Sequence, residues 1–531
     1  MRNDSSISTR LICALVASVV TASVMSIPAS SQAIPPLQRP QLVVGIMVEG
    51  LNDDYLRLLN HLFTNGGFRR LMREGVNFET VDYGPGVDKA AAAAILFTGA
   101  APTVNGIPGS TVYDPEKRSL QSTFINPENK FSPSALLVST LADEVRLDGG
   151  GTGYVYSIAA DPEDALIMAG HAGNSAYWID DVTGQWTTTG YYTDEPQPAR
   201  GRNIAGSITS RIDTMEWTPL LPPAQYPDVT IARKNRPFKH RFADNNASVF
   251  KAFKKSGKGN TEITDLAYDY LRQMPLGKRG VTDMLNISYS VAPYEYGKDE
   301  DPRFEMFDSY IRLDSDLDRL FKLIDTQIGK DNVLIFLTGT PAPPVGKRPD
   351  ERWNIPSGQF SGRKASSLLN MYLMALHGNG EWVSSHHNRH FYLNHTLIKE
   401  HNLDAATVRR EAADFLIRMS GVSGVYTVED VMTSRAGSNP EGLRRNTLVR
   451  HSGDVIVEIN PGWELVDDDV PGFKVPPSRD NANISSAYIF APGVSPERVK
   501  EPLDARRISP TVARLLRIRS PNGASLHPYR L

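Results

Sequence analysis

The sequence QLVVGIMVEG at residues 41–50 decides the fold class, because it is a continuous apolar run. Such runs are typical of strands that are buried on both faces of a parallel sheet. Apolar residues with helical spacing follow over residues 55–75. Further buried strands are predicted at residues 153–159, 283–290, 332–339 and 487–493. The chain is therefore expected to build its core on a sheet of buried strands.

Amphipathic helices alternate with these strands. Residues 307–329 place Tyr310, Leu313, Leu317, Leu320, Ile324 and Ile328 on one helical face. Residues 509–518 predict a helix with Ser509 as N-cap and Pro510 at its first position. This alternation predicts an α/β fold with a doubly wound, mostly parallel central sheet. Residues 172–265 are rich in Trp, Tyr, Thr, Pro and Gly, and we expect an inserted cap there, over the strand ends.

The first 33 residues have the pattern of a secretory signal peptide. Arg2 and Arg10 precede an apolar run that is short for a membrane span, and Ser31-Gln32-Ala33 resembles a cleavage site. An uncleaved anchor is the alternative. Cys13 is the only cysteine, so residues 34–531 can form neither a disulfide nor a thiolate site. The prediction is an exported protein of the bacterial periplasm or cell surface, without a transmembrane segment once the signal is removed.

The net charge of −3 gives no indication of a nucleic-acid partner. A candidate site begins instead at GPGVDKAAAAAILFTG, residues 84–99, which predicts a loop that enters a helix capped by Asp88. The N-terminus of a helix favours an anion. Its first helical residue here is Lys89, a cation, which the helix dipole disfavours by about 0.3–1 kcal/mol. Lys89 is therefore either a functional residue or a solvated one.

The order of several segments resembles the alkaline phosphatase superfamily, in particular its secreted bacterial branch with a threonine nucleophile, which is related to nucleotide pyrophosphatases/phosphodiesterases. The resemblance covers about residues 41–518. Its anchors are VVGIMVEG, ILFTGAAPTVNGIPGSTVYD, AGHAGNSAYWIDDVTGQWTTTGYY, YIRLDSDLDRLFKLID, VLIFLTG, GDVIVEINPGW and ISPTVARLLRI. It implies the alkaline-phosphatase type of sheet, two zinc ions held by Asp and His, a hydroxyl nucleophile, and cationic groups around the phosphate.

The chain departs from this pattern at the site positions. The nucleophile falls on Lys89, a phosphate-contacting asparagine on Ser110, and a Lys/Arg pair on Asp161 and Glu163. The six metal-ligand positions fall on Glu49, Pro293, Gly297, Thr340, Pro341 and Ile484. Only Glu49 among these six carries a carboxylate. The pattern therefore predicts no bound metal or other cofactor, and two zinc ions only if the chain is a hydrolase after all.

These departures lead to three hypotheses. The first is an exported pseudophosphatase without catalytic residues, which binds an unknown envelope protein or ligand. The second is an active metal-dependent phosphodiesterase, pyrophosphatase or phosphatase with a rearranged site that uses Glu49. The third is new chemistry, with Lys89 as base and Asp161 or Glu163 as acid. In the first hypothesis Lys89 replaces the metal charge and pairs with Glu49, Asp88 or Asp161, which gains at most about 4 kcal/mol per pair before desolvation.

Two other groups of polar residues are candidate metal sites. His386, His387, His390 and His395 lie close together, and His386 and His390 have the i, i+4 spacing of a metal pair on a helix. Asp314, Asp316 and Asp318 alternate like the start of a calcium loop, but Arg319 stands where that loop needs glycine. For both groups we favour a solvated surface, which is a histidine-rich helix or loop in the first and a helix face in the second.

Overall fold

A ten-stranded sheet forms the centre of the computed structural model, in the order β19-β2-β18-β11-β1-β10-β5-β6-β7, with β20 beside β2. The strands are β1 (Leu42–Glu49), β2 (Val76–Asp82), β5 (Val155–Ile158), β6 (Ser175–Ile179), β7 (Trp186–Thr187), β10 (Asp283–Ser290), β11 (Val333–Thr340), β18 (Ile484–Phe490), β19 (Glu497–Val499) and β20 (Leu503–Asp504). Only β18 and β7 run antiparallel to their neighbours. The predicted α/β class and its mostly parallel sheet are confirmed.

The structure describes residues 39–114, 117–193, 196–297, 301–342, 356–435, 439–460, 462–466 and 484–531. The predicted signal peptide at residues 1–33 lies outside these ranges. Within them, every helix is too short or too polar to cross a membrane.

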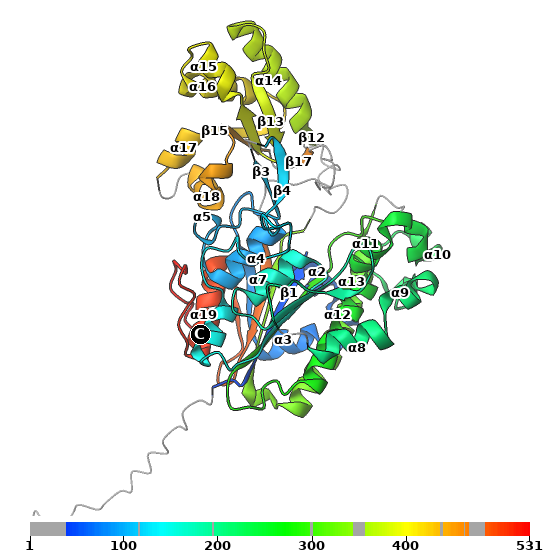
Figure 1. Cartoon of the computed structure of the whole chain (residues 1–531). Coiled ribbons are helices and arrows are strands. Elements are labelled where there is room, and N and C mark those ends of the chain that lie inside the picture. The colour runs from blue at the N-terminus through cyan, green and yellow to red at the C-terminus, as the bar shows by residue number, and fades with distance from the viewer. Residues whose placement is uncertain are drawn as a thin grey trace, which may run out of the picture. The chain divides into compact units, whose positions relative to one another are not determined.

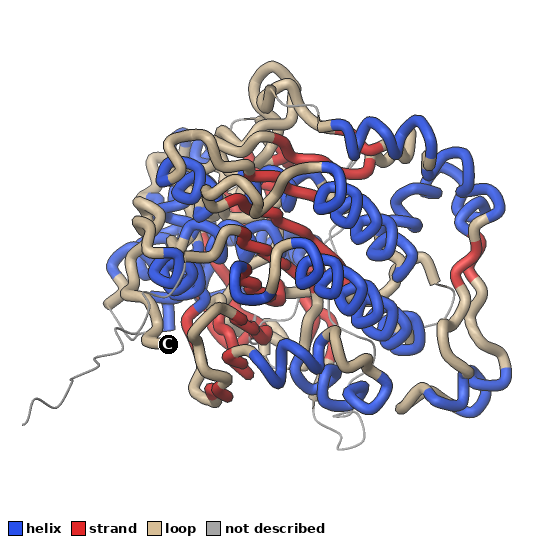
Figure 2. Tube along the Cα trace, turned by 90° about the horizontal axis from the view of Figure 1, so that it is seen from below, coloured by secondary structure: helices blue, strands red, loops and turns tan. Residues whose placement is uncertain are grey.

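Helices cover both faces of the sheet (Figure 1, Figure 2). Alternate residues of β1 point to opposite sides, so that Val44 and Ile46 join one apolar core whereas Val43 and Met47 join another. The first core is covered by α2 (Asp53–Leu59), α3 (Phe68–Glu74), α12 (Gly257–Gln273) and α13 (Arg303–Gln327). The second is covered by α4 (Lys89–Thr98), α6 (Leu141–Asp148), α7 (Pro162–Ala169) and α19 (Ile508–Leu516).

Short elements follow β7 within the range that we predicted as a cap, residues 172–265. They are α8 (Gln197–Ala205), α9 (Ile208–Arg211), β8 (Glu216–Trp217), α10 (Ile231–Asn235), β9 (His240–Arg241) and α11 (Val249–Lys254). The same range also contains β6 and β7 of the central sheet and the first half of α12.

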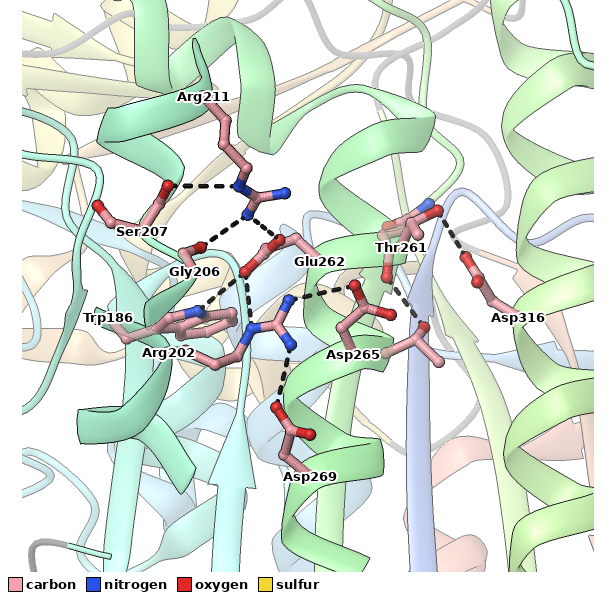
Figure 3. A network of polar contacts seen from close by, with 12 residues as sticks. Trp186, Arg202, Gly206, Ser207, Arg211, Thr261, Glu262, Asp265, Asp269 and Asp316 are labelled. Carbon is pink, nitrogen blue, oxygen red and sulfur yellow. Dashed lines mark hydrogen bonds and ion pairs between the residues drawn. The ribbon is translucent and has the colours of Figure 1, made fainter. Parts of the chain in front are cut away.

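A network of ion pairs ties α8 and α9 to α12 (Figure 3). The Arg202 guanidinium lies 3.0 Å from Glu262, 3.1 Å from Asp265 and 3.0 Å from Asp269. These three acids have i, i+3 and i+7 spacing, which places them on one face of α12. Arg211 of α9 reaches the second oxygen of Glu262 at 2.8 Å. We call these five residues the arginine network.

A second group of elements lies between β11 and β18 along the chain. It has a four-stranded sheet in the order β13-β14-β16-β15 and a core of its own around Trp382 and Phe391. Its elements are β12 (Gly358–Ser361), α14 (Gly362–His377), β13 (Val383–His387), β14 (His390–Leu393), α15 (His395–Glu400), α16 (Ala405–Leu416), β15 (Val422–Thr427), α17 (Val428–Thr433), α18 (Asn439–Asn446), β16 (Val455–Ile459) and β17 (Trp463–Val466). This second sheet and its core were not predicted from the sequence.

The histidine-rich segment belongs to this second sheet. β13 and β14 form an antiparallel hairpin in which His387 lies opposite His390. The proposed metal pair on a helix, His386 and His390, is therefore wrong, and so is the alternative of a solvated helix or loop. Burial lowers the pKa of His387 to about 4 and that of His390 to about 3, so both are neutral at pH 7. His395 instead contacts Asp454 at 2.8 Å.

The aspartates of α13 are also buried rather than solvated. Asp314 is 1% exposed and accepts hydrogen bonds from the backbone N–H groups of Thr64 and Phe68. Asp316 is 5% exposed and accepts from Thr261 and Arg319. The prediction of a solvated face is wrong because these carboxylates cap a loop and pair with a neighbouring helix.

Candidate active site

Three central strands end side by side at one edge of the sheet. Glu49 at the end of β1 pairs in register with Ser290 of β10 and with Thr340 of β11. Parallel neighbours in register point their side chains to the same face, so Glu49, Ser290 and Thr340 all face the second core, where α4 and α7 pack. The carboxyl ends of parallel strands are the usual place for a site in this class of fold.

The N-terminus of α4 begins at this edge, as predicted. The Asp88 side chain caps the helix by accepting from Ala91 N at 2.9 Å, and it also accepts from Ser110 N at 2.8 Å and Ser110 Oγ at 3.2 Å. The Asp88 carboxylate thus accepts hydrogen bonds from the helix N-terminus and from Ser110, and among the described contacts it does not pair with Lys89. Ser110 lies beside the N-terminus of α4 but contributes its hydroxyl to the cap.

Lys89 points into a group of carboxylates. Its Nζ lies 2.9 Å from Asp161 Oδ2, 2.9 Å from Asp164 Oδ2 and 3.5 Å from Glu49 Oε2. The Lys89 side chain is only 20% exposed, so the alternative of a solvated lysine is wrong. The structure brings together Glu49, Lys89 and Asp161, three of the residues selected from the sequence, and adds Asp164, which the sequence analysis missed.

Two more lysines reach the same carboxylates from the end of α11. Lys254 Nζ lies 2.9 Å from Asp161 Oδ1 and also pairs with Asp181. Lys255 Nζ lies 3.2 Å from Asp161 Oδ2 and 3.4 Å from Glu49 Oε2. The sequence analysis missed both. We call Lys89, Lys254, Lys255, Glu49, Asp161, Glu163 and Asp164 the lysine cluster.

Burial and charge shift the pKa values of this cluster in opposite directions. Burial disfavours the ionised Asp161, but attraction to Lys254, Lys255 and Lys89 outweighs it and holds the pKa of Asp161 well below its usual range. Burial also opposes the charge of Lys89, yet Asp164, Glu49 and Asp161 raise its pKa well above the usual value. Lys89 is thus firmly protonated, which contradicts the hypothesis that it acts as a base.

Glu163 behaves differently from Asp161 and Lys89. Burial, followed by repulsion from Asp161, raises the pKa of Glu163 to about 7. Its side chain is partly exposed, and it forms no ion pair with the described residues. Asp164 also has a raised pKa, caused first by burial. A carboxyl group whose pKa lies near 7 is suited to accept and release a proton at neutral pH.

The remaining predicted metal positions offer few ligands. Pro293 and Gly297 follow β10, Thr340 and Pro341 end and follow β11, and Ile484 begins β18, where only its backbone is described. Among the described residues no group of three His, Cys, Asp or Glu is arranged to hold a metal ion. The oxygens of Glu49, Asp161 and Asp164 that face the cluster contact lysine ammonium groups instead. The described residues at this edge therefore do not fit a pair of zinc ions.

The fold is a mostly parallel α/β sheet with a group of charged side chains at the carboxyl ends of its central strands. The chain belongs to the family of type I phosphodiesterases / nucleotide pyrophosphatases, whose family model matches residues 43–481.

Relatives cover almost the whole chain. Alkaline phosphatase PhoV of Synechococcus elongatus is 27% identical, over 92% of this chain and 92% of that protein. A Myroides odoratus protein named calcium-transporting ATPase is 28% identical, over 95% and 97%. Alkaline phosphatase PafA of Elizabethkingia meningoseptica is 25% identical over 93% and 94%, and the wild-type crystal structure of PafA superposes with a TM-score of 0.80 at 23% identity, over 92% of this chain and 98% of PafA.

These relatives correct the predicted function. The prediction of a binding or scaffold pseudophosphatase is wrong, because the chain matches proteins named as alkaline phosphatases along nine tenths of its length and belongs to a phosphodiesterase family. An active hydrolase, the second hypothesis, is favoured. The pseudophosphatase prediction rested on the loss of the family's nucleophile and metal-ligand residues at the aligned positions, and it did not take account of Lys254 and Lys255, which reach the same carboxylates.

Proposed function

We propose that the chain hydrolyses phosphoric esters at the lysine cluster, with phosphodiesters as preferred substrates. The family and the names of the relatives support this class of reaction. The observation that carries the proposal is the convergence of Lys89 and Lys255 on Glu49 and Asp161 at the carboxyl ends of the central strands. Glu163, two residues from Asp161, is the carboxyl group whose pKa is raised to about 7 by burial. Phosphoryl transfer needs mainly positioning and cationic groups around the phosphate, and three ammonium groups gather in this cluster.

Each residue then has a defined role. Lys255, the most exposed of the three lysines at 31%, and Lys89 contact the non-bridging oxygens of the phosphate. Glu163 in its ionised form accepts a proton from a water molecule whose oxygen attacks the phosphorus. The P–O ester bond breaks, and the leaving oxygen keeps the bonding electron pair and takes a proton from solvent. A general base of this kind contributes about 10²–10⁴-fold to a rate.

The charge of the cluster favours diesters over monoesters. The three ammonium groups pair with Glu49, Asp161 and Asp164, and Lys254 pairs with Asp181 as well, so the cluster carries no excess of positive charge. A phosphodiester brings one negative charge, whereas a phosphomonoester brings two at neutral pH and is repelled more strongly by the carboxylates. Export, supported by the signal-like pattern of residues 1–33, is part of the proposal.

The test compares bis(p-nitrophenyl) phosphate with p-nitrophenyl phosphate at pH 8. We expect kcat/KM to be at least about tenfold higher for the diester, which corresponds to about 1.4 kcal/mol. Glu163→Gln should lower kcat for the diester by about 10²-fold or more. Glu128→Gln is the matched control, because Glu128 is 71% exposed and far from the cluster in the sequence. No turnover of either ester, or a Glu163→Gln variant with the wild-type rate, would contradict the proposal.

A further inference from the structure

The contacts of Asp161 show what neutralises the buried acids of the cluster. Its Oδ2 lies 2.9 Å from Lys89 Nζ and 3.2 Å from Lys255 Nζ, and its Oδ1 lies 2.9 Å from Lys254 Nζ. Both oxygens that a metal ion would use are therefore in contact with ammonium groups. Asp161 lies at the centre of this arrangement, since all three lysines meet on it.

The two other acids are paired in the same way. Glu49, which is 6% exposed, lies 3.4 Å from Lys255 and 3.5 Å from Lys89 through the same oxygen. Asp164, which is 1% exposed, lies 2.9 Å from Lys89 and accepts from Ser288 Oγ at 2.7 Å. Carboxylates buried to this extent are costly unless a cation lies against them. The cluster therefore depends on its ammonium groups for stability.

A zinc ion requires three or four ligand atoms of suitable type, and a pair of ions requires more. The described positions that follow the central strands supply Pro293, Gly297 and Pro341, whose side chains have no donor atom. A metal ion at Asp161 or Asp164 would also have to displace Lys89, whose ammonium group lies between them. The geometry and the donor set thus disagree with the zinc pair that the family resemblance implies.

We propose that the ammonium groups of Lys89, Lys254 and Lys255 supply the positive charge that a metal pair would supply, so that the protein folds and acts without a resident metal ion. The part about catalysis rests on the proposed function, whereas the part about folding does not. Burial opposes the charge of each lysine, but the neighbouring carboxylates raise all three pKa values above the usual range, so the charges persist across the pH range of a working enzyme.

The first test measures metal content and stability without an activity assay. Elemental analysis of the purified chain, produced with zinc in the medium, should find substoichiometric zinc. The thermal unfolding midpoint should stay the same after treatment with EDTA and after addition of zinc chloride. One or more tightly bound zinc ions per chain, or a fall of the midpoint in EDTA, would overturn the proposal.

The second test uses paired variants. Lys89→Met should lower the unfolding midpoint by several degrees, because Asp164 is left buried beside an uncharged side chain. Lys89→Met combined with Asp164→Asn should regain part of that loss, since the unpaired carboxylate is gone. Lys322→Met is the surface control, since Lys322 is 72% exposed and its ion pair among the described residues is with Asp318. A double variant as unstable as the sum of its two single variants would contradict the pairing.

If Lys89→Met does not fold, the proposal remains testable through Lys255→Met, whose side chain is 31% exposed. Its fall in midpoint should be reduced when Glu49→Gln is added. These readouts separate the two proposals: a metal-free, stable chain that hydrolyses no ester would leave this inference standing and would contradict the proposed function.

Discussion

The lysine cluster and the arginine network are both dense in buried charge, yet they differ in construction. In the arginine network, one guanidinium makes three ion pairs with acids from one face of α12 (Figure 3). In the lysine cluster, the acids come from β1 and from the start of α7, and the cations come from α4 and the end of α11. The planar guanidinium of an arginine fixes the positions of its carboxylate partners, whereas the ammonium group of a flexible lysine side chain can change partners when a ligand binds.

The carboxyl groups of the lysine cluster differ from one another in pKa. Within the lysine cluster, the pKa of Asp161 is lowered while those of Glu163 and Asp164 are raised. Neighbouring carboxyl groups with pKa values pushed apart are a mark of acid–base chemistry. The arginine network joins α8 and α9 to α12 through ion pairs. Charge density alone therefore does not identify a site, and divergent pKa values are a further criterion for choosing a candidate.

The largest expected effect tests the structural role of the arginine network. Arg202→Ala should lower the free energy of unfolding by about 3 kcal/mol, because Glu262 is only 4% exposed and loses its main partner. Activity per folded molecule should not change. Urea denaturation monitored by circular dichroism would measure the free energy of unfolding, and the diester assay would measure the activity.

Arg211→Ala is the matched control for that prediction. Arg211 contacts the same glutamate but is 43% exposed, so its loss should cost about 1 kcal/mol or less. Equal losses for the two variants would show that the network does not act through Arg202, and a lower rate in folded Arg202→Ala would place the network within the catalytic machinery.

The second prediction concerns the pH dependence of kcat/KM, which tests the lysine cluster. Because Glu163 must be ionised to accept a proton and its pKa is raised to about 7, kcat/KM for the diester should fall about tenfold per pH unit below 7 and level off above it. Glu163→Gln should lack this inflection. A wild-type profile that is flat between pH 5 and 9 would exclude Glu163 as the base.

The smallest effect comes from His171, whose side chain is 36% exposed, and its buried partner Asp143. His171 Nδ1 lies 3.1 Å from Asp143 Oδ2 and Nε2 lies 3.0 Å from Leu136 O, and the hydrogen bond to Asp143 raises the pKa of His171. A raised pKa stabilises the fold fully below the unfolded value of about 6.5, and this stabilisation is lost as the pH rises through the folded value. The destabilisation caused by His171→Ala should therefore be largest at pH 6 and should shrink towards pH 9 in denaturant titrations. A difference that grows with pH would contradict the assignment.

The sequence predicted those parts of the fold that depend on local pattern. The strand β1 is a continuous apolar run, and β5, β10, β11 and β18 are mostly apolar; each of the five lies in the central sheet. The proximity of Glu49, Lys89 and Asp161 was expected because the family resemblance aligns them with a metal ligand, the nucleophile and a phosphate-binding residue of one site. The hairpin at His387 and His390 was not predicted, because its strands are short and polar.

The rest of the site depends on contacts that are distant in the sequence. Lys254 and Lys255 lie more than 160 residues from Lys89, at the end of a six-residue helix with no strong periodicity. The only signal was the adjacent lysine pair in FKKSG, which is also typical of an exposed helix end. Asp164 was missed for another reason. The family resemblance aligned Asp161 and Glu163 with phosphate-binding residues, whereas Asp164 contacts Lys89 only because it lies in the first turn of α7.

The antiparallel direction of β18 affects how the segment between β11 and β18 can change in length. Because β18 runs opposite to β11, the chain leaves the sheet at Thr340 and re-enters it at the same edge, beside the end of β1. The described residues between these two points include the four-stranded sheet with its own core, and they also contact the main body elsewhere, as in the hydrogen bond that Asn446 donates to the Pro85 carbonyl. A change in the length of this segment leaves the strand order of the central sheet unaltered.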